Sequence, residues 1–343
     1  MSPSEEIQQQ CDVAIKFLSE GKLDQAVVEF TDILKKDKTI PLAWNNRGIA
    51  LMSLGHPFDA IMNIDKAIEL QPKEAAYYNN RGAAYFDLGQ EEAAVASYEK
   101  ALDLHPEFCQ ASMNKGNALK ALGKLKESLE PYRKAVTYDP TFVDAHLNLA
   151  FAELTAGNYD NGWKEFEWRW KSHQLPPRGL SFPQWKGESL EGKTLLVYGE
   201  QGLGDQIQFG RYVPMVKAKF GGTVLYEVRF PIVRLMKTLE GIDGIISYGE
   251  KIPKSIDYVI PVMSLPLMLG TTAETIPWNG PYIKADPERV ALWQQKLKAL
   301  PEGLKVGICW AGMSRTGRPE AEAVDKIRST TLQSFAPLAL VPG

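Results

Sequence analysis

An asparagine recurs every 34 residues in the first half of the chain, and this spacing limits the folds that the chain can adopt. The four positions are Asn46, Asn80, Asn114 and Asn148. A strict period of this length indicates a repeat architecture, in which each unit buries one face against the next. The first half is therefore predicted to be a stack of similar units that carry the same polar side chain at the same place.

Other residues keep the same period and predict two helices per unit. Small residues let the two helices approach, glycines permit the turn between them, and prolines end the second helix. These positions are Gly48, Gly82, Gly116 and Ala150, then Gly55, Gly89, Gly123 and Gly157, then Pro72, Pro106 and Pro140. The pattern resembles the tetratricopeptide repeat, which implies an α-solenoid over residues 1–172 with a weaker first unit from about Ile7. The aromatic block 162–170 is predicted to cap the open end, with ligand stacking as the alternative.

The repeated asparagines are candidates for binding a polypeptide. In tetratricopeptide arrays the first helices line the concave face, and an asparagine amide offers the acceptor and donors that match a peptide unit. The column resembles the asparagine ladder of the O-GlcNAc transferase solenoid. This resemblance implies that Asn46, Asn80, Asn114 and Asn148 hold a protein or peptide segment by its backbone. The alternative is that each amide only ties neighbouring helices together, since regular spacing fits both.

After residue 172 the pattern changes from helix pairs to alternating strands and helices. Residues 173–192 contain a turn-rich run and are interpreted as a linker. Strands predicted over 193–198, 223–228, 244–248 and 257–262, with helices between them, indicate a Rossmann-like parallel sheet in residues 193–285. Residues 286–343 are expected to add a connecting helix over 288–300 and an incomplete second Rossmann-like unit, with a strand over 305–310 and a helix from about Thr331. The expected fold class is thus α plus α/β.

A glycine-rich loop lies between the first strand and the first helix of this sheet. It contains Gln201, Gly202, Gly204 and Asp205. It is not a dinucleotide fingerprint, because its sixth position is Ile207, and it is not a P-loop. Such loops still place backbone N–H groups at the carboxyl end of a sheet, where ligands bind. Asp205 is either a catalytic carboxylate that faces a cleft or an N-cap of the helix.

The amino-acid composition limits the kinds of catalytic site that the sheet can contain, and it also bears on the cellular compartment. All four histidines lie at or before residue 173, and no Asp-x-Asp pair is present, so neither a histidine-based triad nor a metal site is expected in the sheet. A base there should be Asp or Glu, with Arg, Lys and backbone amides as anion stabilisers. Three scattered cysteines, the lack of a signal peptide and the lack of a long apolar run favour the cytoplasm and no membrane span. The net charge of −3 does not predict nucleic-acid binding.

Residues 192–212, with the sequence GKTLLVYGEQGLGDQIQFGRY, carry a second resemblance. Together with Val306–Gly312 and the cluster Asp325–Ser329 they resemble bacterial tetratricopeptide-repeat glycosyltransferases, whose transferase part is similar to the heptosyltransferase family. The resemblance implies two Rossmann-like halves that face each other across a cleft (the GT-B arrangement). It also implies metal-independent transfer of a sugar from a nucleotide-sugar, without a cofactor, to an acceptor recruited by the array. Asp205 would be the catalytic base.

The same resemblance implies a donor-phosphate site in the second half. It maps to Gly312, Arg315, Lys326, Arg328 and Ser329, which supply charge-assisted donors. Met313 stands where relatives often carry asparagine, and most of the donor-binding half is absent from the sequence. We therefore expect either the N-terminal portion of a glycosyltransferase or a natural truncation. The truncated form would be a non-catalytic protein-interaction adaptor with an inert α/β tail.

Overall fold

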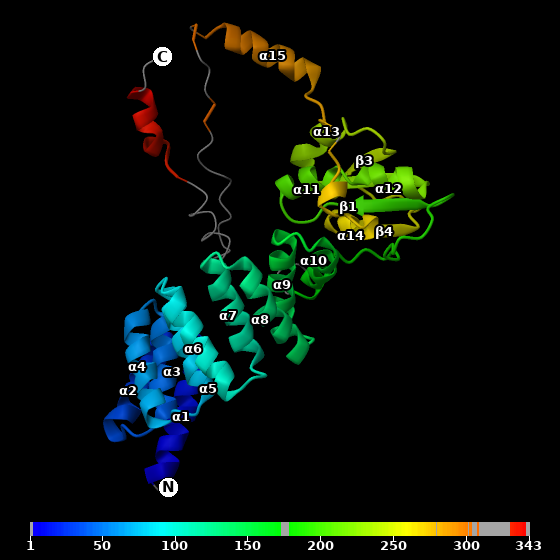
Figure 1. Ribbon diagram of the computed structural model, residues 1–343. Coiled ribbons are helices and arrows are strands. Elements are labelled where there is room, and N and C mark those ends of the chain that lie inside the picture. Colours follow the sequence, from blue (N-terminus) through cyan, green and yellow to red (C-terminus); the bar gives the residue numbers. More distant parts are fainter. Residues whose placement is uncertain are drawn as a thin grey trace.

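The computed structural model consists of a row of helix pairs followed by a small α/β unit (Figure 1). It describes residues 3–172, 178–278, 280–300, 302–303, 307–308 and 330–340. Among these residues we find no helix with the length and apolar character needed to cross a membrane. The same residues contain no group of His, Cys, Asp and Glu side chains that could hold a metal ion.

Five helix pairs form the row, and their bounds keep the 34-residue period. The first helices are α1 (Pro3–Ser19), α3 (Pro41–Ser53), α5 (Ala75–Asp87), α7 (Cys109–Ala121) and α9 (Val143–Thr155). The second helices are α2 (Leu23–Lys36), α4 (Pro57–Leu70), α6 (Glu91–Leu104), α8 (Leu125–Tyr138) and α10 (Tyr159–Phe166). The predicted helical solenoid is confirmed. It begins at Pro3 rather than near Ile7, because α1 has 17 residues where α3 has 13.

The two helices of a pair touch at the small residue of the repeat. A Cβ atom added to Gly82 of α5 would lie 2.5 Å from Cε1 of Tyr98 on α6. Gly116 and Tyr132 repeat this contact in the next pair, at 2.6 Å. Only glycine leaves room there for the buried tyrosine ring. The small-residue column therefore sets the distance between the helices of a pair.

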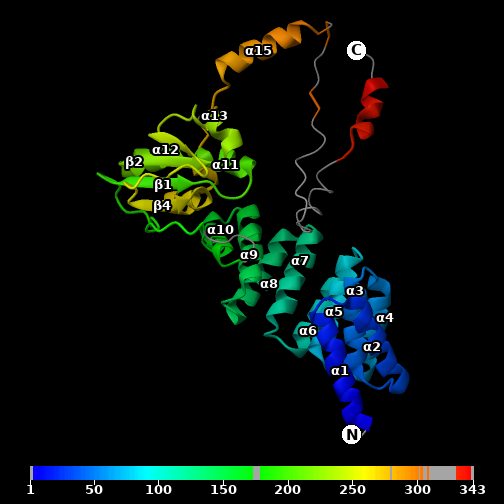
Figure 2. The same ribbon diagram turned by 180° about the vertical axis from the view of Figure 1, so that it is seen from behind.

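The first helices form the inner row of the stack. Helices α3, α5, α7 and α9 pack directly against one another, whereas each second helix packs mainly on the first helices beside it. Closer spacing in one row than in the other curves such a stack and leaves a concave side made of the first helices. Figures 1 and 2 show the row from opposite sides.

The α/β unit contains a parallel sheet of 4 strands. Its strands are β1 (Thr194–Tyr198), β2 (Thr223–Val228), β3 (Gly244–Ser247) and β4 (Tyr258–Pro261), in the order β3-β2-β1-β4. After β3 the chain therefore crosses to the opposite side of β1. The crevice at the carboxyl ends of β1 and β4, where the strand order reverses, is the place where open α/β sheets bind ligands.

Helices cover one face of the sheet. They are α11 (Leu203–Gly210), α12 (Val213–Phe220), α13 (Val233–Met236) and, beyond β4, α14 (Leu265–Leu269). Leu195, Val197 and Tyr226 lie in the core under them, together with Phe166 of α10. On the other face Leu196 packs against Leu180 and Phe182. The strands are therefore buried on both faces, as in parallel sheets generally.

The segment before β1 belongs to the sheet rather than to a free connector. The Trp185 N–H donates to the Val259 carbonyl at 2.9 Å, and the Val259 N–H donates to the Pro183 carbonyl at 2.9 Å. The Trp185 side chain is 1% exposed. The linker predicted over residues 173–192 is therefore shorter, because residues from about 180 onward pack along the β4 edge. Residues 173–177 lie outside the described residues.

Helix α15 (Pro287–Lys298) extends away from the sheet in both views (Figures 1 and 2). The helix predicted over 288–300 is thus confirmed. The 3-10 helix η5 (Leu332–Leu340) lies where a helix was predicted from about Thr331. The strand predicted over 305–310 falls almost entirely outside the described residues, so the second α/β unit stays a prediction.

The end of the array lies between the last repeat and the sheet. After α10 the chain forms the 3-10 helix η1 (Glu167–Lys171). Trp168 stacks on His146 of α9, with ring centroids 3.7 Å apart. The Trp163 indole N–H donates to the Thr271 carbonyl at 3.2 Å, which joins α10 to the loop after α14. The aromatic block therefore covers the last repeat, as predicted, and also attaches the sheet.

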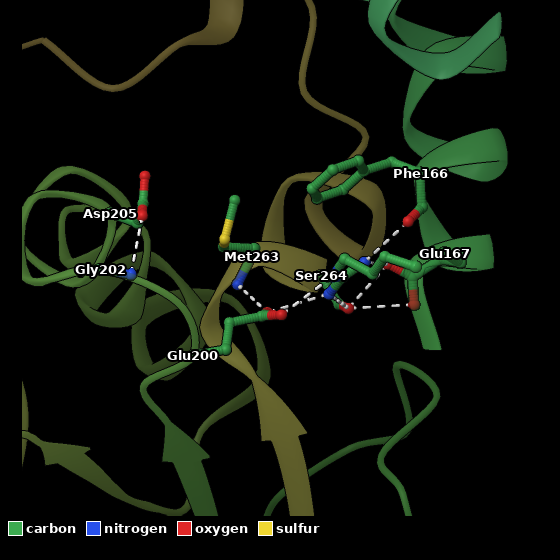
Figure 3. Close-up of polar contacts among 8 residues, drawn as sticks. Phe166, Glu167, Glu200, Gly202, Asp205, Met263 and Ser264 are labelled. Carbon is green, nitrogen blue, oxygen red and sulfur yellow. Dashed lines mark hydrogen bonds and ion pairs between the residues drawn. The ribbon is translucent and has the colours of Figure 1, made fainter. Parts of the chain in front are cut away.

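Arg169 of η1 lies at the centre of this junction, and its partners Phe166, Glu167, Glu200 and Ser264 are labelled in Figure 3. Its side chain is 1% exposed, and Nε and Nη2 donate to the two carboxylate oxygens of Glu200, each at 2.9 Å. Nη2 also donates to Ser264 Oγ at 2.7 Å, and Nη1 donates to the Phe166 carbonyl at 3.1 Å and to Glu167 Oε1 at 2.7 Å. All five N–H groups of the guanidinium are therefore used.

This arginine fills the point where the strand order reverses. Glu200 follows β1, and Ser264 ends the 3-10 helix η3 (Val262–Ser264) that follows β4. Burial by itself would lower the pKa of Arg169, but hydrogen bonding and the charge of Glu200 outweigh it and raise the pKa. The rings of Phe166 and Trp170 lie 4.5 Å from the guanidinium carbon and add cation–π contacts. The arginine therefore stays charged inside the junction.

Removing this arginine should weaken the junction strongly. In Arg169→Ala the Glu200 carboxylate, in a residue only 8% exposed, loses its charged partner. We expect the free energy of unfolding to fall by about 3–5 kcal/mol, as measured by urea titration followed by tryptophan fluorescence. The control is Lys164→Ala, which removes an exposed ion pair with Asp160 on α10 and should cost less than about 0.5 kcal/mol. Equal stability of the two variants would contradict the role assigned to Arg169.

Candidate peptide-binding surface and candidate active site

The repeated asparagines form a hydrogen-bonded column along the first helices. Asn80 Nδ2 on α5 donates to Asn45 Oδ1 on α3 at 2.9 Å, and Asn114 Nδ2 on α7 donates to Asn79 Oδ1 on α5 at 3.0 Å. Asn45 and Asn79 are 5% and 7% exposed, whereas the asparagine one position later in each helix is half-buried. The column therefore ties neighbouring units together, as the structural alternative expects.

The hydrogen bonds between units leave some donors and acceptors of the asparagine amides unused. Asn80 uses one N–H toward Asn45, and its Oδ1 accepts one bond from Asn79 Nδ2 at 3.4 Å. Asn46 Oδ1 accepts from Asn45 Nδ2 at 3.0 Å. An amide has two N–H groups and two lone pairs on its oxygen, so Asn80 keeps one of each. The same side chain can hold the array together and still bind a peptide unit.

The column stops before its last member. The position that would accept a bond from Asn148 is occupied by Met113, which has no amide. Within the part of the chain that the structure describes, the half-buried Asn148 side chain has no hydrogen-bond partner. Asn148 therefore separates the two possible roles of the column, because it lacks the contact between units.

The basic residues beside the column are turned toward the second helices. Arg47 Nε donates to Asn63 Oδ1 at 2.7 Å. Arg81 Nη1 pairs with Asp65 at 3.2 Å, and Lys115 Nζ pairs with Glu99 at 2.8 Å. Carboxylates between the helix rows thus neutralise Arg81 and Lys115, whereas Arg47 bonds to the neutral side chains of Asn63 and Thr31. All three side chains are directed toward the second helices and do not form a basic stripe on the concave side.

Asp205 lies in the first turn of α11 rather than at the N-cap. The N-cap is Gly202, because Gln201 adopts a left-handed conformation (φ 55°) and Gly202 an extended one, so the helix begins at Leu203. Asp205 Oδ2 accepts a hydrogen bond from the Gly202 N–H at 2.9 Å. The residue is half-buried, and its other carboxylate oxygen has no partner among the described residues. Figure 3 shows the carboxylate directed away from Glu200.

Gln206 attaches this loop to the sheet. Its side chain is fully buried, and Oε1 accepts a hydrogen bond from the Arg229 N–H at 3.0 Å. A Cβ added to Gly199 would lie 2.6 Å from Gln206 Cδ, so the glycine at the end of β1 makes room for the amide. The loop beside it stays open, since Gly202 and Gly204 are exposed and Phe230, after β2, is 80% exposed.

The donor side of the predicted site lies beyond what can be described. Gly312, Arg315, Lys326, Arg328 and Ser329 are all outside the described residues. The structure therefore describes only the part of the predicted site around Asp205 and the glycine loop, and the predicted donor-phosphate residues stay a prediction.

Sequence reasoning missed the charged residues that join the two bodies. Arg169 and Glu200 lie 31 residues apart in different structural patterns, and neither has a periodic partner. Another buried carboxylate, Glu227 of β2, pairs with Arg178 in the segment that precedes β1. A buried arginine inside an aromatic block was the available signal, because such a position needs a carboxylate.

Two segments of the array match known families. Residues 75–108 match the family described as tetratricopeptide repeat, and residues 116–157 match the family described as TPR repeat. Among curated proteins the chain is similar to FlbA of Caulobacter vibrioides, with 27% identity over 183 residues. That match covers 47% of this chain and 30% of FlbA, so the chain spans less than a third of this relative.

Some solved structures are similar to part of this chain. MamA is 24% identical, with a TM-score of 0.42, and the match covers 46% of this chain and 93% of MamA. PilF of Pseudomonas aeruginosa is 19% identical, with a TM-score of 0.46, and the match covers 49% of this chain and 78% of PilF.

The 34-residue period, the helix pairs that follow it and the two family matches within residues 75–157 agree with one another. The chain thus contains tetratricopeptide repeats at residues 75–108 and 116–157, within an N-terminal array of helix pairs.

Proposed function

We propose that the chain is a protein-interaction scaffold whose concave side binds an extended polypeptide by its backbone. The observation that supports this most directly is the set of unused amide groups along the asparagine column. After its bonds to Asn45 and Asn79, the Asn80 amide keeps one N–H donor and one acceptor lone pair on its oxygen. These two groups match the one carbonyl and one N–H that each residue of an extended chain offers. Because such contacts involve only the backbone, the array would accept many sequences.

The two roles of the column can be separated by comparing two variants. Asn148→Ala removes an amide without a contact between units, so we expect binding to weaken about twofold to tenfold at unchanged stability. Asn80→Ala also removes the bond to Asn45, so we expect weaker binding and a loss of about 1 kcal/mol in stability. The probe is a peptide of about 15 residues selected from a display library on the protein, long enough at about 3.3 Å per residue to cross several units. Calorimetry gives Kd, and thermal unfolding gives stability.

Asn161→Ala on α10 is the control, since it removes an exposed amide outside the column. It should change neither property. If no library peptide binds, or if Asn148→Ala binds as tightly as the parent, backbone capture by the column is wrong.

A second proposal is that the complete protein is a glycosyltransferase, with the array recruiting its acceptor. Three features of the α/β unit support it. The strand order β3-β2-β1-β4 agrees with the first four strands of doubly wound nucleotide-binding sheets. Asp205 lies at the carboxyl end of β1 with one free carboxylate oxygen. Arg169 already fills the crevice between β1 and β4, so the open part of this edge lies near Asp205 and Phe230.

In this proposal Asp205 takes the proton from an acceptor hydroxyl. The hydroxyl oxygen forms a bond to the anomeric carbon of the nucleotide-sugar as the bond to the nucleoside diphosphate breaks. The electron pair of that bond leaves with the diphosphate, whose charge Gly312, Arg315, Lys326, Arg328 and Ser329 would stabilise. The hydrogen bond from Gly202 fixes the base by one oxygen and leaves the other for the proton.

Asp205→Asn tests the base in the complete protein. An amide oxygen can still accept the bond from Gly202, so we expect unchanged thermal stability and a loss of transfer of about 10²–10⁴-fold. Release of nucleoside diphosphate from a panel of nucleotide-sugars, with a hydroxyl-bearing peptide as acceptor, measures the rate. Asp160→Asn, an exposed acid in the first turn of α10, is the control. Full turnover by Asp205→Asn would discard this assignment, and no turnover by the parent would leave only the scaffold.

A further inference from the structure

One narrow strip of the array is exposed along its whole concave side. In α3 it consists of Leu42, Asn46, Ile49 and Ser53. In the other first helices it consists of the residues at the equivalent positions of the repeat, which lie 34 positions earlier in α1 and 34, 68 and 102 positions later in α5, α7 and α9. We name it the concave strip. At 100° per residue these four positions fall within about 60° of one another around a helix. All of its members are half-buried or exposed, whereas Ala50 and Ala43, which face the preceding unit, are fully buried.

The concave strip contains acidic residues and no basic ones. Its charged members are Asp12 of α1, Asp87 of α5 and Asp144 of α9, and all three are exposed. The remaining members are amides, hydroxyls, alanines and larger apolar residues. Basic residues stand one position away from strip members, namely Lys16 of α1, Arg47 of α3, Arg81 of α5, and Lys115 and Lys120 of α7, but none is a member itself.

Basic residues are held elsewhere by ion pairs. Arg81 pairs with Asp65 and Lys115 with Glu99, both between the helix rows. The second helices carry exposed charges of both signs, such as Lys66 with Glu69 and Lys134 with Glu130. The concave strip therefore carries a weak negative charge, and it lies beside the second helices, whose surface carries charges of both signs.

Apolar members give the strip a second property. Leu42 is 39% exposed and Phe151 is 50% exposed. Phe151 lies at the end of the strip nearest the sheet, with its ring edge-on to Phe166 at 5.8 Å. Exposed aromatic residues next to a packed ring are favourable anchors for apolar side chains.

We propose that the concave strip selects extended polypeptide segments that are uncharged or basic, and that it rejects acidic and phosphorylated ones. The inference rests on the proposed scaffold function and names the class of its partner. The amide column holds the backbone, Phe151 receives an apolar side chain, and the three aspartates repel carboxylates and phosphates. No lysine or arginine of the strip is present to pair with an acidic partner.

Like charges within a few ångströms of each other on a partly desolvated surface disfavour binding by about 1 kcal/mol or more per pair, and salt reduces this effect. The test uses the library-selected peptide in three forms, with three central residues replaced by Gln, Glu or Lys. Calorimetry at low salt should show the Glu form binding at least about tenfold more weakly than the Gln form, and the Lys form as tightly or more tightly. The difference should shrink in 0.5 M salt, at roughly a 4 Å screening length.

Matched protein variants assign the effect to the strip. In Asp87→Asn/Asp144→Asn the ratio between the Gln and Glu forms should fall to about threefold or less. Asp103→Asn, an exposed acid on the second helix α6, should leave the ratio unchanged. A Glu form that binds like the Gln form, or a ratio that the double variant does not alter, would overturn the inference while the scaffold function stands. Failure of every library peptide to bind would overturn the scaffold itself.

Discussion

A buried guanidinium lies at the centre of the contacts that hold the two parts of this chain together. Arg169 of η1 reaches the edge of the sheet, where Glu200 and Ser264 accept hydrogen bonds from its N–H groups. Glu167 of η1 itself accepts another. A charge taken out of water is tolerated only when its partners are complete, and their geometry is then strict. The array and the sheet therefore meet in one arrangement that an apolar contact alone would not specify. The aromatic residues around the arginine exclude water and keep these bonds strong.

The ion pair between Arg169 and Glu200 also determines which part of the sheet is open to a ligand. In an open parallel sheet the crevice between the central strands is the usual site. Here Glu200 stands at that crevice, and its charge is already neutralised by the array. A ligand of the α/β unit would instead meet the exposed loop around Gly202, with Asp205 above it and Phe230 beside it. In the glycosyltransferase proposal, an acceptor recruited by the repeats would have to reach this exposed loop to meet Asp205.

Sequence patterns predicted the features that depend on neighbouring residues and missed those that depend on distant ones. The period of Asn80 and Gly82 predicted the helix pairs, because each unit packs on a copy of itself. The alternation of strands and helices predicted the parallel sheet, because neighbouring parallel strands must be joined by a crossover that is usually a helix. The alternative prediction of Asp205 as an N-cap is wrong, because the N-cap is Gly202, three positions earlier. The helix begins there after a left-handed turn at Gln201, and a non-glycine residue gives no sequence signal for such a turn. The pairing of Arg169 with Glu200 and the packing of Trp185 on the β4 edge join segments that share no period, so no local pattern predicts them.

The first helices of this array meet through neutral asparagine amides rather than through charged side chains. Charged groups between closely packed first helices would need complete ion pairs, whereas an amide satisfies its neighbours and keeps spare donors and acceptors. Basic side chains are therefore placed between the helix rows, where Asp65 and Glu99 neutralise them. The side of the array that faces a partner is left with amides, apolar residues and a few aspartates. In the proposed complex, tolerance toward partner sequence and intolerance toward partner acidity would have one physical origin, since the amides would contact only backbone and the concave strip itself contains no cation to offset a negative charge.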